Sequence, residues 1–152
     1  VFYDKGNYQG GWRYLECSLA DIGSKEWGAQ NTNISTSPGL GAGKANTAAI
    51  LAADPAAGAA KACADYRGGG KNDWWLPSKD ELDLACETME SMYPHNHFFW
   101  SSSQYADDSS YCRSWPSNFT INKGRGTQPE IPEGTTYLDR ETSIFVVAVR
   151  AF

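Results

Sequence analysis

The sequence predicts one α+β domain, and three observations support this. Strand-like segments lie at both ends of the chain, two regions between residues 44 and 93 carry apolar residues at helical spacing, and the part from Gln104 to Asp139 has no helical period. Two helices and several strands around a loop-rich half are typical of an α+β domain. At 152 residues the chain is long enough for one core, so we expect a single domain over residues 1–152.

The composition favours a loop-rich fold with aromatic anchors, since six Trp, eight Tyr and fifteen Gly accompany moderate hydrophobicity. The net charge is -5 and no cluster of Lys and Arg is present, which argues against a nucleic-acid partner. The longest apolar run, Ile144 to Ala148, is far shorter than the roughly 20 residues that span a bilayer, so direct membrane insertion is not expected. The chain opens on strand-like Val1-Phe2-Tyr3 with no visible signal peptide, as an excised fragment or mature domain does.

The N-terminal part predicts two strands and a long connection. Val1–Tyr3 and Trp12–Cys17 flank a turn rich in Gly and Asn. Residues 18–43 are polar, and we expect them to form a surface connection pinned by Trp27.

The middle of the chain predicts the helices. Lys44–Ala53 is rich in Ala, and Asp54-Pro55 is expected to restart the helix as a cap and first residue. The buried face of that segment is expected to contain Ala56, Ala59, Ala60, Cys63 and Tyr66, before Gly68-Gly69-Gly70 ends it. Ser78-Lys79-Asp80-Glu81 is a capping box that starts the next helix, which Pro94 ends. Its apolar face is predicted to carry Leu82, Cys86, Met89 and Tyr93.

The C-terminal part predicts two more strands, at Phe98–Ser102 and Ser143–Phe152. The last is apolar on both faces, as is typical of a central strand covered on two sides. Such a strand needs a neighbour, and Trp12–Cys17 is the natural candidate.

Four segments together carry a resemblance to a known family. They are Gly11 to Glu16, Gly43 to Ile50, Asp73 to Leu82, and Trp100 to Ser103 with the terminal Val149 to Phe152. In this order they resemble C-type-lectin-like domains of prokaryotic and viral surface proteins, as in the C-terminal domains of bacterial collagen-like adhesins. The broader group includes variable proteins of diversity-generating retroelements.

The resemblance implies paired N- and C-terminal strands, two helices flanking a mixed or antiparallel sheet, and a long loop-rich insertion that carries binding. The matched residues themselves are interpreted as scaffold. Trp74, Trp75, Leu76 and Trp100 are expected in the core. Arg150 is expected to pair with a carboxylate such as Glu81 or Asp73.

The predicted binding surface lies between about residues 104 and 140. Its Tyr and Trp offer rigid contact area, while Ser, Asn and Asp offer adaptable hydrogen bonds. The candidate ligand-binding residues are Tyr105, Asp107, Asp108, Tyr111, Arg113, Trp115, Ser117, Asn118, Tyr137 and Asp139. In a retroelement-diversified protein the variable positions would fall here and towards Arg140. The alternative is that Tyr111, Trp115 and Phe119 alternate along a strand and are half buried.

Several motifs are discounted. Gln128-Pro129-Glu130 resembles a calcium and sugar triplet of lectins, but calcium needs six to eight converging oxygens, so no cofactor is expected and calcium stays the alternative. Residues 39–44 depart from the phosphate-binding loop pattern, because Pro38 and Ala45 occupy two of its fixed positions. His95 and His97 are interpreted as part of a turn.

The cysteines leave two interpretations open. Cys17, Cys63, Cys86 and Cys112 lack the close spacing of zinc or redox motifs. They form two disulfides, with three connectivities to choose from, or some are simply small buried side chains.

The sequence therefore predicts a non-catalytic recognition domain of a secreted, cellular or virion surface protein. Its ligand is expected to be a protein or glycan on another surface. A trimerising cap of a fibre or stalk is the alternative. A formylglycine-generating-enzyme-like oxidase, with Cys86 and Cys112 as copper ligands, is the enzymatic rival.

Overall fold

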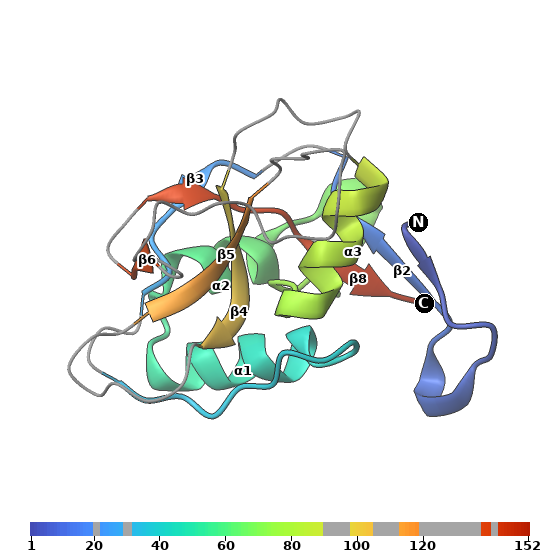
Figure 1. The fold of residues 1–152 in the computed structure, drawn as a ribbon, viewed down its shortest axis with the longest axis horizontal. Coiled ribbons are helices and arrows are strands. Elements are labelled where there is room, and N and C mark those ends of the chain that lie inside the picture. The colour runs from blue at the N-terminus through green and yellow to red at the C-terminus, as the bar shows by residue number, and fades with distance from the viewer. Residues whose placement is uncertain (20–21, 29–31, 90–97, 105–112, 119–137, 141–142) are drawn as a thin grey trace, which may run out of the picture.

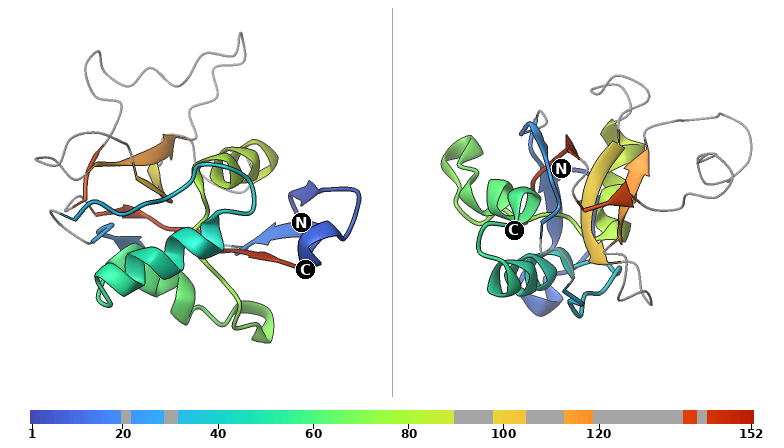
Figure 2. Two further views of the ribbon diagram at one scale, coloured as in Figure 1. Left: turned by 90° about the horizontal axis from the view of Figure 1, so that it is seen from below. Right: turned by 90° about the vertical axis from the view of Figure 1, so that its left-hand side faces the viewer.

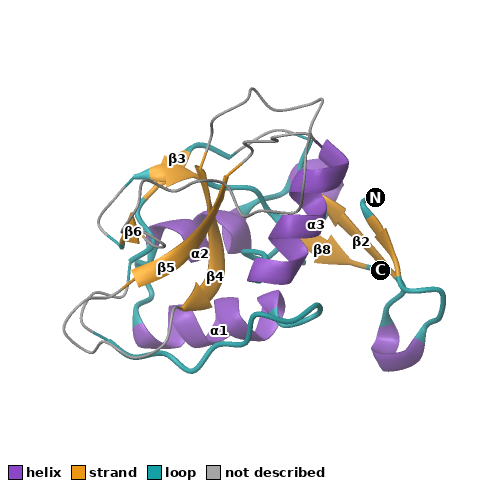
Figure 3. Ribbon diagram, in the orientation of Figure 1, coloured by secondary structure: helices purple, strands orange, loops and turns teal. Residues whose placement is uncertain are grey.

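Three α-helices and two β-sheets make up the computed structural model of the protein, as Figures 1 and 3 show, and the α+β class is confirmed. The structure describes all residues except 20–21, 29–31, 90–97, 105–112, 119–137 and 141–142. The helices are α1 (Gly43–Ala53), α2 (Gly58–Asp65) and α3 (Lys79–Met89). The strands are β1 (Tyr3–Asp4), β2 (Tyr14–Cys17), β3 (Ser24–Lys25), β4 (Phe98–Gln104), β5 (Arg113–Asn118), β6 (Leu138–Asp139), β7 (Ile144–Phe145) and β8 (Val149–Ala151). None of the helices among these residues is long and apolar enough to cross a membrane.

The smaller sheet joins the two ends of the chain. Its order is β1-β2-β8, both pairings are antiparallel, and Leu15 lies opposite Ala151. This confirms that the second strand pairs with the C-terminal one. A 3₁₀ turn over Gln9–Gly11 connects β1 to β2, and positive φ angles of 77° and 83° at Gly10 and Gly11 explain the glycines there. Figure 1 shows the termini side by side at this sheet.

The C-terminal segment is divided between the two sheets, which corrects the prediction of one strand over residues 143–152. β7 belongs to the larger sheet and β8 to the smaller one, with Val146 to Ala148 between them. Val146 and Ala148 enter the main hydrophobic cluster, whereas Val147 packs with Leu82 and Phe99 on the other side. Figure 2 shows the segment passing between the α1–α2 layer and the layer of β4, β5 and α3. Both of its apolar faces are therefore covered, as expected.

The larger sheet has the order β3-β7-β4-β5-β6. It is mixed, because β4 runs parallel to β7 and antiparallel to β5. The short strand β3 lies inside the predicted connection of residues 18–43 and was not expected from the sequence. Trp27 in that connection is fully buried, and its Nε1 donates to the Ser101 carbonyl at 2.8 Å, so its anchoring role is confirmed.

The described residues form three α-helices, where the sequence predicted two. α1 has the expected bounds to within one residue, but α2 begins at Gly58 and not at Pro55. Asp54 is extended (φ -144°, ψ 97°), as a residue before proline tends to be, and its Oδ1 accepts a hydrogen bond from the Ala56 amide. Ala56 is consequently exposed, which corrects its place in the predicted buried face; Ala59, Ala60 and Cys63 are buried and Tyr66 packs against them.

The third helix begins at the predicted capping box. The Glu81 amide donates to Ser78 Oγ at 3.4 Å, and the Ser78 amide donates to Glu81 Oε2 at 2.9 Å. Leu82 and Cys86 are buried as predicted. The side chain of Met89, together with Tyr93 and Pro94, lies outside the described residues.

The matched scaffold residues lie in the core. The exposed fraction is 8% for Trp74, 5% for Trp75 and 0% for Leu76 and Trp100, so their predicted burial is confirmed.

Arg150 makes two ion pairs that fasten β8 to its surroundings. Its Nε and Nη2 donate to the two oxygens of Asp73 at 2.7 and 3.0 Å, and its Nη1 donates to Glu16 at 2.7 Å. Asp73 was one of the two predicted partners. The prediction of Glu81 as the other possible partner is wrong, because the Glu81 carboxylate accepts hydrogen bonds from Gly41, Gly43, Trp75 and Ser78.

The Asp73–Arg150 pair predicts a pH dependence of stability. The hydrogen bonds from Arg150 hold the pKa of Asp73 below its ordinary value of 3.8. A carboxyl whose pKa is lowered by folding stabilises the protein above its ordinary pKa, and that contribution is lost as the pH falls through the folded value. We expect Asp73→Asn to lower the free energy of unfolding at pH 6 and to have a shrinking effect below about pH 4. Urea unfolding at pH 6, 4 and 3 measures this; an unchanged difference at all three would contradict it.

Candidate binding surface

The predicted ligand-binding residues fall into two groups. Arg113, Trp115, Ser117 and Asn118 lie on β5, and Asp139 lies on β6. The remaining five, Tyr105, Asp107, Asp108, Tyr111 and Tyr137, are outside the described residues, as are Phe119 and the Gln128-Pro129-Glu130 triplet.

The pairing of β5 with β6 brings together residues that are far apart in the chain. Arg113 lies opposite Asp139 and Ser114 opposite Leu138 in an antiparallel ladder. Residues directly opposite one another in such a ladder have Cβ atoms about 4.5–5.5 Å apart. Two predicted binding residues of opposite charge therefore occupy neighbouring positions in the sheet. On its other side β5 pairs with β4, where Ser117 lies opposite Phe99.

Gln104 and Arg140, at the two ends of the predicted surface, use their side chains for contacts within the protein. The predicted binding surface is therefore shorter than residues 104–140. At the first end, the Gln104 side chain accepts from the Ile34 amide at 2.6 Å and donates to Asn33 at 2.7 Å. At the other, Arg140 is fully buried, with its guanidinium 4.1 Å from the Trp27 ring centroid. Arg140 Nη1 also donates to the Thr32 carbonyl at 3.0 Å. Both side chains serve to attach the surface to residues 27–34 and do not belong to it.

The first turn of α3 holds a buried carboxylate, that of Glu81, which is fully inaccessible to solvent. Its Oε1 accepts from the amides of Gly41 and Gly43, at 2.9 and 3.4 Å. Its Oε2 accepts from the Ser78 amide and from Trp75 Nε1, at 2.9 and 3.1 Å. Burial raises the pKa of Glu81, while these four hydrogen bonds act in the opposite direction.

The contacts of Glu81 also explain the glycine-rich segment before α1. The backbone amides of Gly41 and Gly43 in this segment donate to the Glu81 carboxylate, so they are not available to bind a phosphate. A Cβ atom at Gly43 would lie 2.3 Å from Glu81 Oε2 and 2.6 Å from Trp75 Cδ1, so only glycine fits there. The sequence indicated the cap formed by Glu81 but gave no local signal for these contacts, which join positions about forty residues apart.

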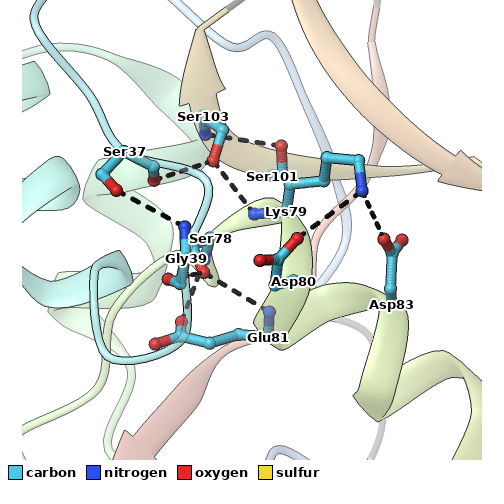
Figure 4. A network of polar contacts seen from close by, with 9 residues as sticks. All are labelled: Ser37, Gly39, Ser78, Lys79, Asp80, Glu81, Asp83, Ser101 and Ser103. Atoms are coloured by element: carbon cyan, nitrogen blue, oxygen red, sulfur yellow. Dashed lines mark hydrogen bonds and ion pairs between the residues drawn. The ribbon is translucent and has the colours of Figure 1, made fainter.

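The serine run after Trp100 is part of the same scaffold. Ser103 Oγ accepts from the Lys79 amide at 3.0 Å and donates to the Ser37 carbonyl at 3.1 Å (Figure 4). Ser102 Oγ donates to the Pro77 carbonyl at 3.1 Å, and Ser78 Oγ donates to the Gly39 carbonyl at 2.8 Å. The end of β4, the start of α3 and the lead-in to α1 are thus hydrogen-bonded to one another. This network fixes the point at which the chain leaves β4 towards the predicted surface.

Three cysteines are free thiols, which corrects the two-disulfide interpretation. Cys17, Cys63 and Cys86 have no disulfide partner, and Cys112 lies outside the described residues. Burial raises the pKa of all three thiols, to about 11 for Cys17. Such thiols are protonated at neutral pH, whereas metal ligation and nucleophilic attack require the thiolate. Within the described part of the chain no three His, Cys, Asp or Glu side chains gather as metal ligands do.

Comparison of the chain with protein-family models and with curated proteins finds no match.

The Glu81 contacts predict a large effect of a small substitution. Glu81→Gln keeps the shape of the side chain but points an NH₂ group at two hydrogen-bond donors. We expect the free energy of unfolding at pH 7 to fall by about 1–3 kcal/mol, the cost of unsatisfied buried polar groups. Glu87→Gln is the matched control on the exposed face of α3, with an expected change below about 0.5 kcal/mol. Chemical unfolding of both variants measures this, and equal effects would contradict it.

The raised pKa of Cys17 predicts slow alkylation. The rate of carboxamidomethylation of Cys17 should still rise about tenfold per pH unit between pH 8 and 10, because the thiolate is scarce below its pKa of about 11. Peptide mass spectrometry of the native protein measures the rate, with the fully buried Cys63 as an internal control that stays unmodified. A rate that levels off by pH 9 would show an ordinary thiol.

Proposed function

We propose that the chain is a non-catalytic recognition domain of C-type-lectin-like fold, which binds a protein or glycan on another surface. The site is formed by β5, β6 and the segments that precede and follow β5. In this proposal the protein is displayed on a cell or virion surface or secreted, and the binding face is a diversified one, as in variable proteins of retroelements.

The observation that carries the proposal is the pairing of β5 with β6. Five predicted binding residues lie on these two strands, and Arg113 and Asp139 are directly opposite one another. Among the described strands, β5 and β6 lie at one end of the larger sheet, and β6 pairs with β5. A binding face built on paired strands is held more precisely than one built on loops alone.

The division between scaffold and surface is a second support. Residues of the four matched segments form hydrogen bonds with one another through Glu81 and the serine network, and the tryptophans of these segments are buried, so the matched residues serve as scaffold. Figure 2 shows β5 on the side of β4 away from α1 and α2. In this proposal, substitutions on β5 alter recognition.

The antiparallel pairing of β2 with β8 supports the proposed fold, which joins its N- and C-terminal strands.

The state of the cysteine thiols supports a binding role over the rival interpretation as a formylglycine-generating-enzyme-like oxidase. Copper(I) ligation by Cys86 would need a thiolate, and burial of Cys86 disfavours that form.

An array screen over glycans and surface proteins tests this function, repeated with Tyr111→Ala and Trp115→Ala. Removal of an aromatic side chain that anchors a binding face typically weakens the binding free energy by about 2 kcal/mol or more. We therefore expect about a thirtyfold or greater loss of affinity. Tyr8→Ala is the matched control, because Tyr8 is 63% exposed and lies between β1 and β2, in the smaller sheet's connection and not on β5 or β6.

Binding that survives both Tyr111→Ala and Trp115→Ala, or that is lost equally in Tyr8→Ala, would move the site elsewhere. The diversified character has its own test in the gene's neighbourhood. A reverse transcriptase and a near-duplicate of the 3′ end are expected there, and the absence of both would remove this part of the proposal.

A further inference from the structure

A hollow of about 220 Å³ is lined in part by residues of the smaller sheet. Figure 1 shows this sheet at the other end of the molecule from β5 and β6. Its walls come from four parts of the chain: the turn before β2, the lead-in to α1, the segment before α3, and β8. The side chains that line it include Trp12, Trp75, Lys44 and Asp73, and the backbone of Gly11 and Gly41 completes it. Aromatic walls with a few polar groups are typical of small-molecule sites, and this volume suits a ligand below drug size.

The aromatic walls are held in place before any ligand arrives. Trp75 donates its Nε1 proton to Glu81, and its backbone N–H and C=O both bond to Val149, at 2.8 and 2.9 Å. Gly41 has a φ of +83°, and a Cβ atom there would lie 3.3 Å from the Trp12 ring. Because the indoles and the glycine loop fix one another, binding would cost little ordering of the walls.

The charges around the hollow favour an anion. Asp73 lines it, and both of its carboxylate oxygens accept from Arg150, which also pairs with Glu16, so this one guanidinium offsets the two carboxylates only in part. Lys44 is exposed, its ammonium is 5.9 Å from the Trp75 ring centroid, and it has no ion pair with any residue that the structure describes. A second ammonium, that of Lys5, lies 3.9 Å over the Trp12 ring. Lys5 does not line the hollow and donates to the Gln9 carbonyl, so Lys44 is the ammonium that an anion in the hollow would meet.

We propose that this hollow binds a small ring-bearing carboxylate, whose ring contacts Trp12 and Trp75 and whose carboxylate pairs with Lys44. The apolar walls favour the ring, and the ammonium makes a charge-assisted hydrogen bond to the carboxylate. This second site is separate from the recognition surface on β5 and β6.

Titration of the full chain with benzoate at low ionic strength, followed by saturation-transfer NMR, tests the proposal. We expect saturable binding with a midpoint below about 10 mM. Benzamide has the same ring without the charge and should bind at least about tenfold more weakly, the loss expected for a charge-assisted bond. Lys44→Met keeps the aliphatic stem and should weaken benzoate binding by a similar factor.

Lys61→Met is the matched control, because Lys61 is an exposed lysine of α2 that does not line the hollow. It should bind benzoate as the unmodified chain does, and all variants should keep the same thermal midpoint. The proposal is overturned by any of three results: no saturable binding of benzoate, equal binding of benzamide, or equal weakening by the two lysine substitutions.

Discussion

The hydrogen bonds received by the Glu81 carboxylate are the constraint on which the rest of the structure depends. They originate at Gly41 before α1 and Gly43 at its start, at Trp75 beside β8, and at Ser78 before α3. A charge with no access to water is tolerated only when its oxygens are fully bonded, so all of these backbone segments must hold their positions together. The packing of Trp75, the close approach of the glycine loop and the direction of α3 therefore depend on a single side chain.

Sequence patterns within single elements predicted part of the packing around Glu81. The cap of Ser78 and Glu81 spans four residues, and the apolar spacing of Leu82 and Cys86 is a property of one helix, so the sequence indicated both. The break at Asp54 was missed because the same residue caps a helix as readily as it closes a turn with the Ala56 amide. The division of the C-terminal strand was missed for a different reason. Apolar residues on both faces of Val146 to Ala148 fit one central strand as well as a passage between two sheets.

The sequence indicated which residue types form the candidate site, but it did not indicate which of these residues lie next to one another in the structure. Tyr, Trp, Ser and Asp in succession indicated a recognition surface, but the opposition of Arg113 and Asp139 depends on pairing across twenty-five intervening residues, which no local pattern encodes. Arg140 illustrates the limit well. The sequence placed it near the diversified positions of the surface, whereas its side chain is fully buried, stacks on Trp27 and donates to the Thr32 carbonyl. The sequence also gave no indication of the hollow beside Trp12, because its walls come from four separate parts of the chain.

The pairing of β2 with β8 has a consequence for how the protein acquires its structure. Glu16 and Arg150, which meet across these strands, are 134 residues apart in the chain. During synthesis β1 and β2 can pair with each other, but β2 has no β8 beside it until residues 149–151 are made, so the Arg150 ion pairs form late. Closing so long a loop is entropically costly and is associated with slow folding. Until that moment the apolar side of β2, with Leu15 at its centre, is open to other chains, and a chaperone or rapid export would limit aggregation at this stage.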